Sequence, residues 1–358
     1  MARRAARGTG GGAGARLGLT VAAALAGAAG ARWGLRRWRS RGKTLRDRVV
    51  TITGGSRGLG HMLARLAAAE GARVAICARD VAELERARLN LAERGADVLA
   101  VPCDVTRPDE VQHLVNETLG RFGRIDVLVN NAGVIQVGPL AEMTLDDFRQ
   151  AMDVNFWGTV HATMAVLPHM RSRQQGRIVN ITSIGGKVAM PHLLPYDCAK
   201  FAALGFSEGL RAELADDGVS VVTVVPGLMR TGSVASARFK GHVEEEFSWF
   251  SAAAQSRLTA MHVRHAAARI VEAMRGGDGE LLLGWQTRLA EVGKALFPGL
   301  AARVLALVDR GLPADERPGD LPPLPGTTAG KDIAAARRVR EFGAPLVPLV
   351  SGRGGQGS

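Results

Sequence analysis

The chain of 358 residues contains only three cysteines and a single tyrosine. Cys77, Cys103 and Cys198 are odd in number and far apart, and they form no Cys-x-x-Cys or Cys/His pattern. Neither a disulfide framework nor a metal site is therefore predicted, which fits a reducing compartment. We interpret Cys198 as a small residue on a buried helix, with an oxidisable thiol as the alternative. The one tyrosine, Tyr196, precedes Lys200 by one helical turn and needs an explanation.

The part of the chain after residue 48 lacks an excess of basic residues. Residues 1–48 carry twelve Arg or Lys and one acid, Asp47, and so hold nearly all of the net charge of +12. A nucleic-acid-binding domain would carry a basic face on its folded part. Nucleic acid is therefore not a predicted partner, and a membrane surface or plain solvation explains the basic arm better.

A full-length hydrophobic span is also lacking. The uncharged run Leu17–Ala31 has 15 residues, mostly Ala and Gly, whereas a bilayer core requires about 20. A secretory signal is disfavoured because a basic cluster, residues 32–43, follows at once. A marginal membrane anchor and a disordered extension both remain open. The anchor would keep the main domain in the cytoplasm, at the inner face of the membrane.

From residue 49 onward, short apolar runs alternate with helix-length segments. Runs without polar alternation are typical of strands buried on both faces of a parallel sheet. The predicted fold is α/β, a Rossmann-like doubly wound parallel sheet of about seven strands with helices on both faces. The predicted strands are Val49–Thr53, Arg73–Arg79, Asp97–Asp104, Ile125–Asn130, Arg177–Thr182, Ser220–Val225 and Glu280–Leu283.

Three segments make up the expected organisation. Residues 1–43 form the basic Ala/Gly-rich arm, residues 44–310 the α/β domain, and residues 311–358 a Pro/Gly-rich tail that begins as a flexible linker. Within the domain, residues 227–260 show no clear strand. Residues 289–308 predict a helix with an apolar stripe, broken near Pro298.

The first strand runs into a glycine-rich turn, Thr53-Gly54-Gly55-Ser56-Arg57-Gly58-Leu59-Gly60. Glycines between a strand and a helix let the backbone approach a pyrophosphate, and the helix N-terminus then supplies free N–H groups and a favourable dipole. The spacing differs from the usual Gly-x-Gly-x-x-Gly. Taken alone, such a turn is a weak indication of nucleotide binding, because glycines also simply make turns.

Several motifs in a fixed order resemble the short-chain dehydrogenases/reductases. They are the glycine-rich turn, Asp104-Val105, Asn130-Asn131-Ala132-Gly133, a tetrad of Asn155, Ser183, Tyr196 and Lys200, and Pro226-Gly227 followed by Thr231. The resemblance covers residues 45–284 and implies a nicotinamide cofactor and a dimer or tetramer. The residues expected at the cofactor are Gly54, Ser56, Arg57, Gly58, Leu59, Gly60, Arg79, Asp104, Val105, Asn131, Ala132, Gly133, Tyr196, Lys200, Pro226, Gly227 and Thr231.

The tetrad also makes chemical sense residue by residue. Tyr196 and Lys200 are at i and i+4 and share a helix face. A free phenol has a pKa of about 10, and a nearby ammonium lowers it, so Tyr196 is expected to act as acid and base near neutral pH. Ser183 can hold the substrate oxygen. By resemblance, Asn155 holds a water that links Lys200 to solvent. Taken singly, each residue has a structural alternative, such as a helix cap for Ser183.

Cofactor choice is read at the end of the second strand. NAD sites place an acid there for the ribose 2′-hydroxyl, but this chain has Ala78 followed by Arg79. With Arg57 in the turn, two cations and no acid suit a 2′-phosphate. NADP(H) is therefore predicted, the alternative being that both arginines are solvated. Asp80 is interpreted as the cap of the next helix.

The substrate side is apolar. The loop of residues 188–194 is apolar, and so are residues 228–260, which the resemblance implies form a lid. Their side chains suggest that the substrate is an apolar carbonyl or alcohol, although both segments could simply pack on the core. His192 is interpreted as a loop residue, and Glu244–Glu246 as a solvated helix start. The predicted activity is hydride transfer between NADP(H) and a carbonyl or alcohol carbon. A non-catalytic NADP-binding sensor or scaffold, and epimerase-type chemistry, are the alternatives.

Overall fold

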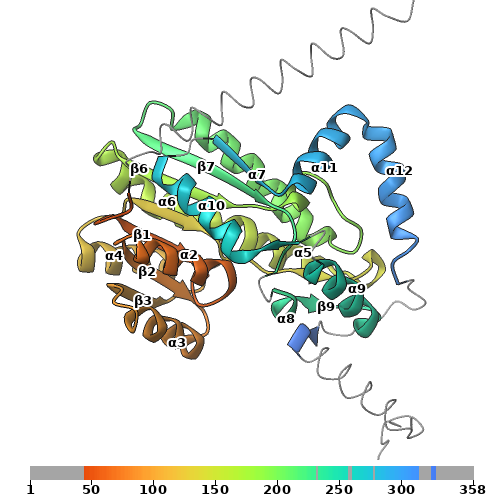
Figure 1. Cartoon of the computed structure of the whole chain (residues 1–358), viewed down its shortest axis with the longest axis horizontal. Coiled ribbons are helices and arrows are strands. Elements are labelled where there is room, and N and C mark those ends of the chain that lie inside the picture. Colours follow the sequence, from red (N-terminus) through yellow and green to blue (C-terminus); the bar gives the residue numbers. More distant parts are fainter. Residues whose placement is uncertain (1–43, 231–232, 257–259, 277–278, 314–323, 328–358) are drawn as a thin grey trace, which may run out of the picture.

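The computed structural model describes residues 44–230, 233–256, 260–276, 279–313 and 324–327 (Figure 1). The expected N-terminal arm and most of the expected tail lie outside these residues, as does Thr231. Within the described part of the chain, none of the helices combines the length and apolar character that a membrane span requires.

Seven parallel strands form the central sheet, in the order β3-β2-β1-β4-β6-β7-β11. Each strand agrees with a predicted strand to within two residues at either end, and the fold class is confirmed. The strands are β1 (Val49–Thr53), β2 (Arg73–Ala78), β3 (Val98–Pro102), β4 (Val127–Asn130), β6 (Gly176–Ile181), β7 (Val219–Pro226) and β11 (Gly279–Leu283).

Helices cover both faces of the sheet (Figure 1). One face packs against α2 (Gly58–Ala69), α3 (Val81–Ala92) and α10 (Val263–Gly276), and the other against α4 (Pro108–Phe122), α6 (Gly158–Ser172) and α7 (Leu194–Glu213). Two separate apolar clusters result, one on each side of the sheet, so the strands are buried on both faces and carry apolar residues at nearly every position.

Helix α4 illustrates how local sequence produces these elements. Pro108 occupies the first turn, where its missing N–H costs nothing, and Asp109 and Glu110 favour the positive end of the helix dipole. Gly123 ends the helix with φ of 74°, a left-handed conformation that glycine adopts without strain. Between these signals, the apolar side chains recur at helical spacing and face the sheet.

The strand order creates a crevice at the carboxyl end of the sheet. The chain begins at β1 in the middle, runs outward through β2 to β3, and then crosses back to β4 on the other side of β1. Where the direction of winding reverses, the loops after β1 and β4 diverge and leave room for a ligand. The glycine-rich turn follows β1 and lies at this point.

Small elements lie beside the carboxyl end of the sheet, and they correct two expectations. Residues 227–260 were expected to lack strands, but β8 (Met229–Arg230) pairs with β10 (Met261–His262), and β9 (Arg238–Phe239) pairs with β5 (Gln136–Val137). Two-residue strands are too short to leave a periodic pattern. In the segment expected to be a flexible linker, β12 (Leu324–Pro325) pairs with β9, so residues 324–327 pack on the domain.

Three helices complete the described chain. Helix α9 (Val243–Gln255) lies over the small strands, and α11 (Trp285–Leu296) and α12 (Pro298–Asp309) form a helical hairpin that stands out from the body (Figure 1). The break that was predicted near Pro298 is confirmed, because proline takes the first position of α12. The predicted apolar stripe, however, is exposed and does not face the core.

Candidate active site

The glycine-rich turn is tight because two backbone segments meet there. Gly54 and Gly58 have φ of 65° and 55°. A Cβ on Gly60 would lie 2.2 Å from the Gly54 carbonyl oxygen, so no larger residue fits. Arg57 makes no side-chain capping bond to α2. The first residues of this helix, Gly58 and Leu59, border the cavity, and their N–H groups are the kind of donors that pyrophosphate binding requires.

Asn131 attaches the turn to the end of β4. Its side-chain nitrogen donates to the carbonyl oxygens of Thr53 and Gly54, each at 3.0 Å. In return, the Thr53 hydroxyl oxygen accepts from the backbone N–H groups of Asn131 and Ala132, at 3.0 and 3.1 Å. The sequence placed Asn131 at the cofactor. In the structure it borders the cavity and also spans the two strands at the switch point.

At the end of the cavity near β2, both arginines lie beside acids, and one of these acids, Glu83, was not expected there. Arg57 Nη1 lies 3.3 Å from Glu83 Oε2, and Arg79 Nη1 lies 3.7 Å from Asp104 Oδ2. The Ser56 hydroxyl also donates to Glu83 Oε2, at 2.9 Å. The end of β2 itself carries no acid, as predicted, but the two arginines are not merely solvated, because the third residue of α3 turns its carboxylate back to the glycine-rich turn.

The interpretation of Asp80 is confirmed. Asp80 caps α3, since its side chain accepts from the Glu83 backbone N–H at 2.8 Å. Asp104 and Val105 border the cavity together with Cys103, and their place at the cofactor stays a prediction. Asp104 Oδ1 also accepts from the backbone N–H and the hydroxyl of Thr106, at 3.0 and 2.9 Å, which fixes the turn after β3.

Asn155 lies at an irregular turn of helix between α5 (Leu145–Met152) and α6. The π-type turn η2 (Asp153–Trp157) moves its side chain inward, as such turns often do at functional sites. Its Nδ2 donates to the carbonyl oxygens of Val134 and Ala151, at 3.1 and 3.0 Å, and its Oδ1 accepts from the Val134 N–H at 3.3 Å. Asn155 thus anchors the loop after β4.

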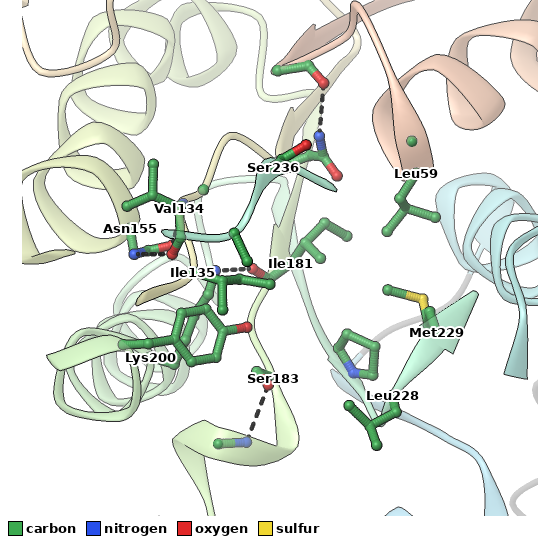
Figure 2. Close-up of a pocket in the computed structure, with 18 of the residues that line it drawn as sticks. Leu59, Val134, Ile135, Asn155, Ile181, Ser183, Lys200, Leu228, Met229 and Ser236 are labelled. Carbon is green, nitrogen blue, oxygen red and sulfur yellow. Dashed lines mark hydrogen bonds between the residues drawn. The ribbon is translucent and has the colours of Figure 1, made fainter. Parts of the chain in front are cut away.

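Lys200 and Ser183 lie on the same side of the cavity as Asn155, facing Leu228 and Met229 across it (Figure 2). The buried Lys200 ammonium donates to the Ile181 carbonyl oxygen at 3.1 Å. Ser183 follows β6 and accepts from the Gly185 N–H at 3.1 Å. It therefore caps the short helix η3 (Ile184–Gly186), which was the structural alternative, and still borders the cavity.

Tyr196 is in the first turn of α7, with its ring 5.7 Å from the Lys200 nitrogen. The two residues share a face as predicted, and an interaction with the Ser183 side chain acts to lower the pKa of Tyr196. The expected direction of the Tyr196 pKa shift is wrong. Burial raises the pKa of Tyr196 to about 12 and lowers the pKa of Lys200 to about 8. Desolvation by burial is the largest cause of both shifts.

Asp197 is an acid beside the site that sequence reasoning missed. Its side chain is fully buried, and Oδ2 accepts from the Met190 N–H at 2.6 Å. Within the described residues, Oδ1 has no hydrogen-bond partner. Burial raises the pKa of Asp197 to about 8. The sequence carried no sign of this, because an acid in the first turn of a helix usually just favours the helix dipole.

The aromatic residues of the lid do both things that the sequence allowed: some pack on the core and others line the cavity. Phe239 is fully buried in a cluster with Val137, whereas Trp249 and Phe250 border the cavity. The expectation for Glu244–Glu246 is wrong at Glu246, which is fully buried. Glu246 Oε2 accepts from the Trp249 indole N–H at 2.6 Å, and Oε1 lies 2.7 Å from His192 Nδ1. This network joins the lid to the loop before α7.

One cavity connects all these parts, and its volume is ≈ 1200 Å³. It extends from Gly54 and Arg79 past Pro226 and Gly227 to Tyr196 and the lid. Its volume exceeds the roughly 300–1,000 Å³ of ordinary small-molecule sites, so a dinucleotide and a substrate fit together. Gln286, Thr287 and Ala290 of α11 also border it, although no motif pointed to them.

Three further expectations concern Thr231, a metal site and Cys198. Thr231, expected at the nicotinamide end, lies outside the described residues. In the described ranges, no group of three or more His, Cys, Asp or Glu side chains is placed to hold a metal ion. Cys198 is exposed and not buried as interpreted, because it lies on the outer face of α7.

Comparisons with known proteins agree with this geometry. A family model described as short chain dehydrogenase matches residues 48–240. The chain is similar to mouse dehydrogenase/reductase SDR family member 7B, 32% identical over 73% of this chain and 81% of that protein. It is 39% identical to human dehydrogenase/reductase SDR family member 7, over 53% of this chain and 58% of that protein.

This chain is also similar to a solved structure, over most of that structure's length. It is an actinorhodin polyketide ketoreductase with NADPH, 31% identical, with a TM-score of 0.60 over 66% of this chain and 95% of that one. This likeness covers the sheet and its helices. The human relative, by contrast, has a large part that is not matched here.

Proposed function

The chain belongs to the short-chain dehydrogenase/reductase family, an oxidoreductase family that uses nicotinamide cofactors, and from this we propose that it transfers a hydride between NADP(H) and a carbonyl or alcohol carbon of an apolar substrate. One observation carries the proposal. A single cavity joins a glycine-rich turn at one end to Ser183, Tyr196 and Lys200 at the other. This arrangement suits a dinucleotide, whose reactive end would lie near the proton donor Tyr196.

The fit to such a cofactor follows from the turn. No side chain other than hydrogen fits at Gly60, and the first residues of α2 border the cavity. Gly54, Ser56, Gly58 and Leu59 would hold the pyrophosphate, and Pro226 and Gly227 the nicotinamide end. When bound, the nicotinamide supplies or accepts the hydride.

In the reducing direction, the chain's own residues handle the oxygen and the proton. With its pKa at about 12, Tyr196 carries its proton at neutral pH and is ready to donate it to the substrate oxygen. Ser183 holds the same oxygen through its hydroxyl. Lys200, with its pKa at about 8, can return a proton to Tyr196. Asn155 keeps the loop beside Lys200 in place, and its proposed role in holding a water remains a prediction.

Specificity for NADP(H) is the finer part of the proposal. Ala78 leaves no acid at the end of β2, and the Arg57 and Arg79 side chains are 62% and 53% exposed. Ion pairs this exposed are worth about 0–1 kcal/mol. A 2′-phosphate forms stronger, charge-assisted bonds to arginine, so both cations can turn from Glu83 and Asp104 to it. The related ketoreductase was solved with NADPH.

An apolar substrate is proposed from the walls of the cavity near Tyr196. Met190, Leu193, Trp249 and Phe250 line this end, which favours a ligand with a large apolar body and one polar group. We also propose a dimer or tetramer, and a cytoplasmic location at the inner membrane face through the basic arm. The sensor and epimerase alternatives gain no support from a specific contact in the site.

Substitution of Tyr196 by phenylalanine tests the proposal. Phenylalanine keeps the ring and its packing but has no proton to donate, so turnover of any apolar ketone that the parent reduces should fall by about 10²–10⁴-fold. NADPH binding, followed by fluorescence, should stay close to that of the parent. Equal rates in stopped-flow assays would exclude Tyr196 as the acid, and an inactive parent that still binds NADPH would favour the sensor.

A further inference from the structure

The hairpin of α11 and α12 carries an unusual amount of exposed apolar surface. Its large apolar side chains repeat at intervals of three or four residues, so each helix presents one stripe, and Phe297 joins the two. Between 37% and 68% of each of these side chains is exposed: Trp285, Leu289, Val292, Leu296, Phe297, Leu300, Val304, Leu307 and Val308.

Helix α12 contributes most to this surface. It has no buried residue, and Arg303 and Asp309 are its only charged residues. A helix this apolar is normally buried, and soluble proteins seldom expose a contiguous apolar patch without a binding role. No described part of the chain covers the stripe, so something else must remove it from water.

The charges around the stripe identify the occupant. Of the two acids on the hairpin, Glu291 pairs with Lys187, and Asp309 Oδ1 lies 3.9 Å from His192 Nε2. The cations Arg288, Arg303 and Arg310 are all exposed, and none forms an ion pair with another described residue. The apolar stripe is therefore bordered by unpaired positive charge.

We propose that this face of the hairpin docks on an anionic lipid surface. The apolar stripe would enter the boundary between headgroups and acyl chains, while the arginines would reach the phosphates. A second copy of the chain fits less well, because a two-fold contact would place two copies of this positively bordered patch against each other. Residues 1–48, with twelve Arg or Lys and one acid, add attraction to the same kind of surface.

Docking would also place the cavity beside the lipid. The opposite face of α11 borders the cavity through Gln286, Thr287 and Ala290. An apolar substrate dissolved in the bilayer could then enter without crossing water. This consequence rests on the proposed function, whereas the docking itself does not depend on any reaction.

The test compares two double variants of the full chain. Leu300→Glu with Val304→Glu places acids on the stripe at side chains that are 61% and 51% exposed, so the fold should persist. Val81→Glu with Leu89→Glu, on α3, makes the same change at 60% and 46% exposure, remote from the hairpin. Partitioning is measured by co-sedimentation with vesicles of phosphatidylcholine and phosphatidylglycerol, and with phosphatidylcholine alone.

We expect the hairpin variant to partition at least about tenfold less well than the parent, because the lost apolar transfer and the added charge act together. The α3 variant should behave as the parent, and vesicles should protect the amides of residues 300–308 of the parent from hydrogen exchange. Unchanged partitioning of the hairpin variant, or no added protection, would overturn the proposal.

Two further measurements separate the other possibilities. If the hairpin variant lowers the mass of the dissolved protein by light scattering but leaves its vesicle binding intact, the stripe is a contact between copies and the proposal fails. NADPH binding without vesicles is measured for every variant. If the parent does not bind NADPH, the proposed function is refuted, and the docking result still stands.

Discussion

Replacement of Asp197 by asparagine should change how stability depends on pH. The carboxyl is fully buried, accepts one backbone hydrogen bond, and has its pKa raised from 3.8 to about 8 by burial. In the unfolded chain this group ionises near its ordinary pKa, whereas in the folded protein it keeps its proton until pH 8. Its contribution to stability is therefore complete below pH 3.8 and is lost as the pH rises to 8.

The size of the effect follows from linkage. Each pH unit between the two pKa values costs about 1.4 kcal/mol of the free energy of unfolding. From about pH 5 to about pH 7.5, the parent should lose up to about 3 kcal/mol through Asp197. Asparagine cannot ionise and can still accept from the Met190 N–H, so the variant should lose little over this interval. Lys200, with its pKa lowered from 10.5 to about 8, acts only above pH 8.

Urea titrations at the two pH values, without nucleotide, measure this difference. The parent's unfolding midpoint should fall between pH 5 and pH 7.5, and that of Asp197→Asn should stay nearly constant. Glu117→Gln, which removes a carboxylate from the exposed face of α4, should fall like the parent. Parallel pH profiles for the parent and Asp197→Asn would show that Asp197 is ionised in the folded protein, against the reasoning.

Three further predictions concern the cavity. Arg79→Ala should weaken NADPH binding roughly tenfold or more and NADH binding far less, because a charge-assisted phosphate contact contributes about 1.5–3 kcal/mol. Fluorescence titrations with both cofactors measure this difference, and tighter NADH binding by the parent would contradict NADP preference. Gly60→Ala should abolish binding of both cofactors, because its Cβ would lie 2.2 Å from the Gly54 oxygen; near-parental affinity in the same titration would argue against the turn as the pyrophosphate site. Trp249→Phe keeps an aromatic wall but removes the donor to Glu246, so KM for an apolar ketone should rise while NADPH affinity stays the same; an unchanged KM would separate the lid from substrate binding.

Much of the fold could be read from local sequence, because the signals are local. Fully buried parallel strands must be apolar throughout, so Val49–Thr53 and its counterparts were predictable as short runs. The glycine-rich turn and the Tyr196–Lys200 spacing depend on backbone geometry over a few residues. Pro298 marked the start of α12 for the same reason. These features require no knowledge of what packs against them.

Features that depend on distant neighbours were not predictable. Glu83 and Glu246 both occur in the first turn of a helix, where an acid usually faces water. The fold instead directs Glu83 to Arg57 and buries Glu246 against His192 and Trp249. A run of charged residues in a sequence does not reveal which member faces the interior.

The direction of the Tyr196 pKa shift was decided by burial. The sequence places an ammonium one turn away and so indicates a lowered pKa, but the cost of ionising a group depends on how much water surrounds it. That quantity is set by the walls of the cavity, which come from the loop after β6, the lid and α11. In the same way, the spacing of apolar residues determined the stripes on α11 and α12, while only the tertiary structure decided that they face outward, because no element among the described residues packs on that side of the hairpin.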